Sequence, residues 1–128
     1  MPPEQKHSEK AARNEQLAAS IDASAENLNE TVVFCRGWAA VIVFYAALHH
    51  VDAYLVARGR PASNHNERFD AIKSDPKIRF ILQQYRYLSS LSQTVRYGTL
   101  NFPPNAYSEA TPYLEAVKSQ LKHALQVT

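Results

Sequence analysis

The stretch Trp38-Ala-Ala-Val-Ile-Val-Phe-Tyr-Ala-Ala-Leu48, followed by His49-His50-Val-Asp52-Ala-Tyr-Leu-Val-Ala57, decides the fold of this chain. It opens with eleven consecutive apolar residues, which leave no polar face if the segment is helical. A helix that is apolar nearly all the way round must be buried. We therefore predict that residues 38–57 form the central helix of a hydrophobic core. The eleven-residue run is too short to cross a bilayer, which needs about 20 residues.

Composition favours a single helical domain. Three of the 128 residues are glycine, the hydrophobic share is 45% and the charged share is 20%, values typical of globular, helix-forming sequences. The one cysteine, Cys35, excludes an internal disulfide and a cysteine zinc site and fits a reducing compartment. No apolar signal-peptide core follows the N-terminal Met. We expect a cytoplasmic protein without a membrane segment or a cofactor.

Helical periodicity continues before the central segment. We expect a flexible N-terminus over residues 1–8 and one domain over residues 9–127. Apolar residues then recur at steps of three and four as far as Cys35, which predicts an amphipathic helix with a possible break near Asp22–Glu26. Its buried stripe would be Leu17, Ile21, Ala25, Leu28, Val32 and Cys35. Arg36-Gly37 is the expected joint into the central helix.

Cap and turn residues divide the second half of the chain. Gly59 is a C-cap signal for the central helix, and Asn64 with Glu67 forms a capping box for a short helix ending near Lys73. Pro76 suits the first position of a further helix that ends near residues 97–98. The buried face of that helix would be Ile78, Ile81, Leu82, Tyr85, Leu88, Leu91 and Val95.

A rigid linker over residues 102–105 precedes the last helix. That helix would bury Leu114, Val117, Leu121 and Leu125, and Pro112 must lie in its first turn or kink it. No strand-like alternation and no internal repeat is present. The fold class we predict is all-α: an up-and-down helical bundle of four main helices plus one short helix.

Charge is distributed unevenly. Residues 1–30 carry three basic and six acidic side chains, a net charge of −3, whereas residues 31–128 carry eleven and six, a net charge of +5. The excess lies between Arg58 and Arg96 and favours an anionic partner. The residues that we predict to contact phosphate or nucleic acid are Arg58, Arg68, Arg79, Arg86, Arg96 and Tyr97. A solvated helix surface would account for the same count of charges.

His49, His50 and Asp52 suggest a metal site at first sight. Neighbouring residues point to different sides of a helix, so His49 and His50 cannot bind one ion together. His49 and Asp52 share a face, which gives at most two local ligands. We expect histidines that are hydrogen-bonded across the bundle, an Asp52 that orients one of these rings or meets Arg96, and no metal.

Three segments carry a family resemblance. They are Tyr45-Ala-Ala-Leu-His49-His50-Val-Asp52-Ala-Tyr54-Leu, Gly59-Arg60-Pro61-Ala-Ser63-Asn64-His65-Asn66-Glu67-Arg68 and Tyr85-Arg-Tyr87-Leu-Ser-Ser-Leu-Ser92-Gln-Thr-Val-Arg96-Tyr97. In pattern and order, residues 38–125 resemble the HEPN family. The resemblance implies an up-and-down bundle that dimerises. Relatives act in toxin–antitoxin pairs, defence systems and nucleotidyltransferase partnerships, and many cleave RNA without a metal through an Arg–x(4 to 6)–His motif that meets across the dimer.

The position of that motif departs from the family. Catalytic members carry it around the end of the third long helix, where this chain has Arg96-Tyr97 and no histidine before His123. The spacing occurs earlier, as Arg60–x4–His65 and also as Arg58–x6–His65. His65 with Arg60 or Arg68 could supply acid–base catalysis and positive charge. The alternative is an ordinary helix start, with an exposed His65 and Arg68 paired to a nearby carboxylate such as Glu67 or Asp70.

Three functions follow from these patterns. The first is a HEPN-like dimer that binds nucleotide or RNA phosphate as an accessory or regulatory module. The second is a metal-independent, toxin-like endoribonuclease with Arg60 and His65 as catalytic residues. The third is a protein-interaction module with no nucleic-acid role. The apolar helix Trp38–Ala57 has more hydrophobic surface than a small core readily covers, so we expect a homodimer through this helix under any of the three.

Overall fold

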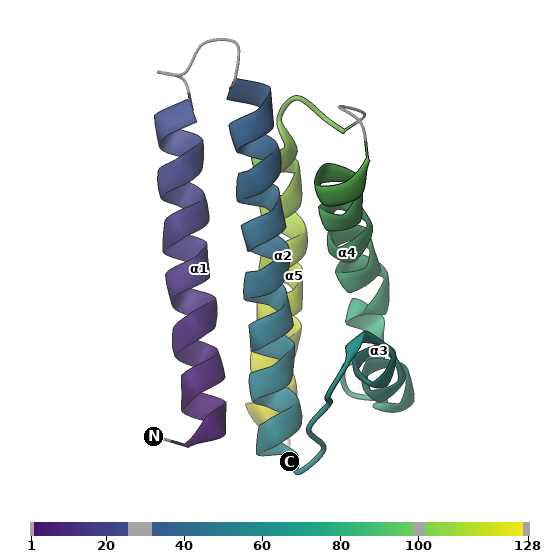
Figure 1. Ribbon diagram of the computed structural model, residues 1–128. Helices are drawn as coiled ribbons and strands as arrows, with labels where there is room; N and C mark the ends of the chain where they lie inside the picture. Colours follow the sequence, from purple (N-terminus) through teal and green to yellow (C-terminus); the bar gives the residue numbers. More distant parts are fainter. Residues whose placement is uncertain (1, 26–31, 99–101, 127–128) are drawn as a thin grey trace.

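The computed structural model describes residues 2–25, 32–98 and 102–126, and in these ranges the protein is helical without a strand (Figure 1). Four long helices and one short one confirm the predicted all-α class. A single 3₁₀ turn, η2, precedes α4. The elements are α1 (Pro3–Ala25), α2 (Val32–Ala57), α3 (His65–Ser74), η2 (Arg79–Ile81), α4 (Leu82–Tyr97) and α5 (Ala106–Gln126).

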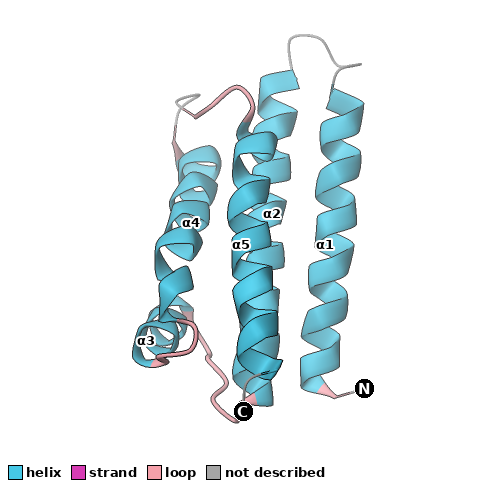
Figure 2. Ribbon diagram, turned by 180° about the vertical axis from the view of Figure 1, so that it is seen from behind, coloured by secondary structure: helices cyan, strands magenta, loops and turns pink. Residues whose placement is uncertain are grey.

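Helix α2 lies at the centre of the bundle. It packs against α1, α4 and α5, and the four long helices alternate in direction, so that the two ends of the chain lie at the same end of the molecule (Figures 1 and 2). The short α3 lies beside the lower part of α4 in Figure 1, between α2 and α4 in the chain order. The corner formed by α2, α3 and α4 holds the candidate site residues His65, Arg68 and Arg96.

The prediction that the apolar segment is buried is confirmed. Fourteen residues of α2 are buried, among them Phe44, Val51, Tyr54 and Leu55. The helix is longer than predicted, because it begins at Val32, and Arg36-Gly37 is an interior turn of α2 rather than a joint. Gly37 has a packing role: a Cβ atom there would lie 2.6 Å from the Phe102 ring. A glycine required for close packing looks the same in sequence as a glycine that ends a helix.

The extra length of α2 changes one argument. The helix Val32–Ala57 is long and apolar enough, by length and composition, to cross a membrane, so the shortness of the apolar run alone does not exclude a span. Half of the relevant window is buried inside the bundle, and a core helix passes the same test. Helices α1, α4 and α5 cover α2 within the chain.

The buried stripe of helix α1 agrees with the prediction at Ala25, and at Ile21, which packs partly buried against the core, but not at Leu17. The helix begins at Pro3, within the segment expected to be flexible, and buries Ala11, Ala18 and Ala25, whereas the Leu17 side chain is 50% exposed. Of the remaining predicted stripe, Leu28 lies outside the described residues, and the last two positions belong to α2. Alanines spaced by seven residues present a flat surface, which lets two helices approach closely and bury backbone instead of long side chains. Ala18 belongs to the same core cluster as the alanines of α2.

The caps between α2 and α3 form at the predicted residues, although the Glu67 carboxylate accepts from the Ser63 N–H and the Asn64 side-chain amide instead of from the Asn64 backbone N–H. Gly59 adopts a φ of +71°, and the N–H groups of Gly59 and Arg60 donate to the carbonyls of Val56 and Leu55 at 3.0 and 2.8 Å. This pattern is a Schellman C-cap, and its left-handed residue favours glycine. Asn64 is the N-cap of α3 and accepts a hydrogen bond from the Glu67 N–H at 2.9 Å.

The connection from α3 to α4 differs in one respect from the prediction. Pro76 does not start the helix: residues 76–78 form a turn, η2 follows, and α4 begins at Leu82. Asp75 ends α3, and its carboxylate accepts hydrogen bonds from the Lys77 N–H at 2.9 Å and the Tyr54 hydroxyl at 2.8 Å. The predicted buried face of α4 is confirmed for Ile78, Ile81, Tyr85, Leu88, Leu91 and Val95.

Helix α5 contains a proline beyond its first turn. The helix begins at Ala106, so Pro112 lies inside it and the first-turn alternative is wrong. Proline cannot donate to the carbonyl four residues earlier. The Thr111 hydroxyl donates to the Ser108 carbonyl at 3.3 Å and so partly satisfies that acceptor. The buried residues Leu114, Val117 and Leu121 are as predicted, but Leu125 is 41% exposed.

Candidate functional site

A buried ion pair links α2 to α3 at the base of the candidate site. Arg68 donates from Nε to Asp52 Oδ1 at 2.7 Å and from Nη2 to Asp52 Oδ2 at 3.2 Å. Both side chains are less than 10% exposed. The predicted partners of Arg68 were Glu67 or Asp70, and those of Asp52 were Arg96 or a histidine ring; both predictions are wrong. The true pairing spans 16 residues and depends on how α3 packs against α2.

His65 lies at the N-terminus of α3 beside the guanidinium group of Arg68. Its Nδ1 is 3.4 Å from Arg68 Nη1, and its ring stacks on Phe44 with the two centroids 6.2 Å apart. The pKa of His65 is lowered by partial burial and by the positive charges of Arg68 and Arg96, which outweigh the opposite effect of Asp52. A lowered pKa keeps the imidazole neutral near pH 7, which is the form that accepts a proton.

Arg96 brings α4 into the same cluster. Its Nη1 donates to the Tyr45 hydroxyl of α2 at 3.1 Å and lies 3.4 Å from the Tyr97 hydroxyl. The guanidinium also lies over both tyrosine rings, 5.7 and 4.9 Å from their centroids. Within the described residues Arg96 has no carboxylate within ion-pair distance, and the Tyr97 side chain is 78% exposed. An uncompensated guanidinium beside an exposed aromatic ring suits a phosphate and its attached base.

The other predicted phosphate contacts lie elsewhere. Arg58 lies over Tyr54 and donates to the Ala124 carbonyl of α5 at 2.6 Å. Arg79 and Arg86 line a shallow hollow with Phe80, Leu82 and Gln83. The six predicted residues therefore divide among separate surfaces, and Arg68, Arg96 and Tyr97 are the ones that share a cluster with His65.

Arg60 and His65 point to different neighbours. Arg60 Nη2 donates to Ser74 Oγ at 3.0 Å at the C-terminal end of α3, whereas His65 faces Phe44 and Arg68 at the N-terminal end. Among the described residues no hydrogen bond, ion pair or ring contact joins Arg60 to His65. The side chains of Arg60 and His65 point in different directions because Arg60 precedes the N-cap of α3, Asn64, and His65 follows it.

The two histidines of α2 point to different partners, as expected for adjacent helical residues. His50 Nε2 contacts Glu15 Oε2 at 2.8 Å, and Lys118 Nζ donates to the other oxygen of the same carboxylate at 2.7 Å. Burial alone would raise the pKa of Glu15, but the hydrogen bonds from Lys118 and His50 outweigh it and lower that pKa. This triad of Glu15, His50 and Lys118 ties α1, α2 and α5 together.

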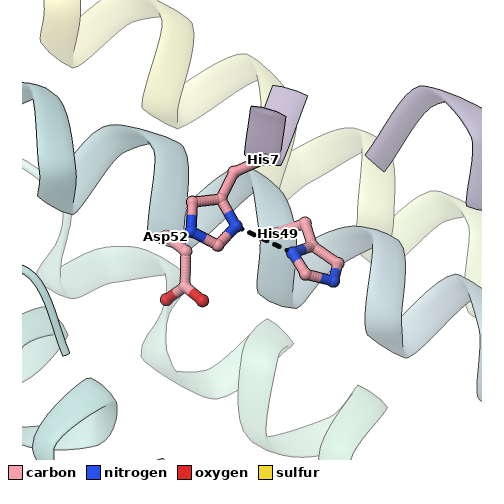
Figure 3. A group of neighbouring side chains, drawn as sticks. All are labelled: His7, His49 and Asp52. Carbon is pink, nitrogen blue, oxygen red and sulfur yellow. Dashed lines mark hydrogen bonds between the residues drawn. The ribbon is translucent and has the colours of Figure 1, made fainter. Parts of the chain in front are cut away.

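His49 contacts a residue from the N-terminal segment, residues 1–8, that was predicted to be flexible. Its Nδ1 lies 2.9 Å from Nδ1 of His7 on α1, and the two rings stack with centroids 5.2 Å apart (Figure 3). Partial burial and electrostatic repulsion from His7 and Lys10 lower the pKa of His49. His7 carried no sequence signal, because nothing in residues 1–8 indicates that they join the bundle.

Comparisons with known proteins do not assign the chain to a family. No family model matches it, and no curated protein matches it significantly.

Proposed function

We propose that this protein is a HEPN-like module that binds the phosphate of RNA or of a nucleotide through Arg96, Arg68, His65 and Tyr97. The observation that supports the proposal is Arg96, which has no carboxylate partner among the described residues, contacts the exposed Tyr97 ring and acts electrostatically on His65. Arginine donates two parallel hydrogen bonds to phosphate oxygens, and an exposed tyrosine ring can stack on a base.

The charge balance of the cluster favours an anion. Asp52 neutralises Arg68, so the Arg96 guanidinium remains as the net positive charge at this corner, with His65 neutral near pH 7. Phosphate binding would bring a second negative group close to His65 and raise its pKa again. We therefore expect binding to strengthen as the pH falls from 7 toward 6.

The test is fluorescence anisotropy with a labelled single-stranded RNA and, separately, a labelled nucleotide. We expect Arg96→Gln to weaken binding about tenfold and to lower the slope of log affinity against log salt by roughly 0.7 for RNA, as for one lost phosphate contact. Tyr97→Ala should weaken RNA binding further. Arg13→Gln, which removes an exposed arginine on α1, is the matched control. Equal losses for Arg96→Gln and Arg13→Gln would refute a defined site.

A metal-independent endoribonuclease is the second candidate, and the geometry of His65 favours it specifically. A neutral imidazole that contacts the Arg68 guanidinium and also experiences the positive charge of Arg96 combines a general base with charge that stabilises a phosphorane. In this arrangement Arg68 and Arg96, rather than Arg60, would accompany His65.

RNA cleavage in EDTA distinguishes the two candidates. If the enzyme is active, His65→Ala and Arg96→Gln should each lower the cleavage rate by 10²-fold or more, whereas Arg60→Ala should retain it. Loss of cleavage in Arg60→Ala would instead place the catalytic site in the Arg60–His65 turn. Intact RNA with retained binding would leave the binding module.

Self-association stays part of the proposal, on a smaller surface than the sequence indicated. The other helices of the same chain cover most of α2. The large apolar side chains of α2 that remain exposed are Phe34 and Trp38, which contact each other edge to face. Light scattering of wild type and Trp38→Glu tests the dimer. Monomers at micromolar concentration in both would contradict it, and would equally weaken a protein-interaction role for this patch.

A further inference from the structure

We propose that His7, His49 and Asp52 form a binding site for a divalent transition metal, with Zn²⁺ the ion of choice. One ligand atom from each residue lies within 4.8 Å of the other two. The site is distinct from the Arg96 cluster, and it joins α1 to α2 (Figure 3).

The short distance between the two histidine rings requires a proton or a cation between their Nδ1 atoms. His7 Nδ1 and His49 Nδ1 face each other at 2.9 Å. Two lone pairs repel at this distance, and two N–H groups would collide, so the pair holds either one proton or one cation. Imidazole nitrogens bound tetrahedrally at 2.0–2.1 Å are about 3.3 Å apart, so the rings need to separate by roughly half an ångström to admit Zn²⁺.

Asp52 supplies the third ligand and is already oriented. It lies one turn after His49 on the same face of α2, and Figure 3 shows its carboxylate beside the His7 ring. Both of its oxygens accept from Arg68, but each carboxylate oxygen has two acceptor positions and can bind a metal with the second. Hydrogen bonds to a metal-bound carboxylate from outside are the usual means of fixing such a ligand.

The ligand set determines the class of ion. Two imidazole nitrogens and one carboxylate oxygen suit Zn²⁺, Co²⁺ or Fe²⁺ and are poor for Ca²⁺ or Mg²⁺, which prefer oxygen. Both histidines are half-buried, which leaves a fourth position open to water. The charges of Lys10 and Arg68 act against a cation at His49, so binding should tighten when Lys10 is neutralised.

The experiment is isothermal titration of untagged, full-length protein with ZnCl₂ at pH 7.5, beside the variants His7→Ala, His49→Ala and Lys10→Gln. We expect one Zn²⁺ per chain, an affinity at least tenfold weaker in either histidine variant, and a several-fold tighter one in Lys10→Gln. His123→Ala, which removes an exposed histidine of α5, is the control and should bind as wild type does. His7→Ala suffices if His49→Ala does not fold.

Two further readouts make the test decisive. Ring nitrogen NMR should show both Nδ1 signals of His7 and His49 shifting on zinc addition, and Zn²⁺ should raise the melting temperature of wild type but not of His7→Ala. Absence of binding in wild type would overturn the proposal. A zinc affinity that is unchanged in His7→Ala would also overturn it. A stoichiometry of half an ion per chain, together with loss of binding in His123→Ala, would overturn it too, because the zinc would then be held between two molecules.

Discussion

Replacing Asp52 by asparagine should remove a large part of the folding stability. The carboxylate accepts two hydrogen bonds from Arg68, at 2.7 and 3.2 Å, and both side chains are less than 10% exposed. Two unit charges about 4 Å apart attract by about 4 kcal/mol at an effective dielectric constant of 20. Breaking a buried pair while its other member stays in place costs about 3–5 kcal/mol, against a total of about 5–15 kcal/mol for a typical domain.

The assay is urea unfolding at pH 7 followed by circular dichroism, with thermal melts beside it. Asp52→Asn keeps the size of the side chain, so the loss reports the unpaired Arg68 and not a cavity. We expect the free energy of unfolding to fall by about 3–5 kcal/mol and the melting temperature to fall by roughly 10–20 °C. Asp70→Asn, at an exposed position of α3, should change the free energy by less than about 0.5 kcal/mol.

A double variant separates charge from packing. Asp52→Leu with Arg68→Met removes both charges and should recover most of the stability lost in Asp52→Asn, because an apolar pair of similar volume avoids the desolvation of two ions. A loss below about 1 kcal/mol in Asp52→Asn would mean that Arg68 finds water or another partner, and the argument from burial would fail. A double variant as unstable as the single one would assign the loss to packing instead.

Three other substitutions follow from local geometry. Gly37→Ala places a Cβ atom 2.6 Å from the Phe102 ring and should cost about 1–3 kcal/mol in urea unfolding, and Phe102→Leu in the same chain should relieve part of this cost. Pro112→Ala restores a helical donor inside α5 and should stabilise by up to about 3 kcal/mol, with a destabilised variant contradicting the argument. Proton NMR should give His65 a pKa below its ordinary value, moving upward in Arg96→Gln. Because the folded-state pKa is lowered, the stabilising contribution of neutral His65 should be present above about pH 6.5 and decline as the pH falls; an unshifted pKa in both proteins would remove this basis for an electropositive site.

Features with a local cause were predictable from the sequence. The burial of α2 follows from its apolar composition, and the caps at Gly59 and Asn64 follow from a left-handed backbone and a side-chain acceptor. The buried face of α4 follows from helical periodicity, which one chain segment carries by itself. These features need no knowledge of which helix lies beside which.

The parts that failed depend on a neighbour distant in sequence. Leu17 fits a helical stripe as well as Ala18 does, and the close approach of a second helix selects the alanine. Gly37 was predicted to be a joint between helices. The Phe102 ring, whose packing requires a glycine at this position, is distant along the chain.

The candidate sites show the same division. Composition and charge indicated a basic surface between residues 58 and 96, and they gave the kinds of residue that bind phosphate. The tertiary structure decided that Arg96 rather than Arg60 lies near His65, that Asp52 pairs with Arg68, and that His7 meets His49. Helix periodicity determines the direction of a side chain about its own axis, but the distance between two side chains on different helices is set by how those helices pack.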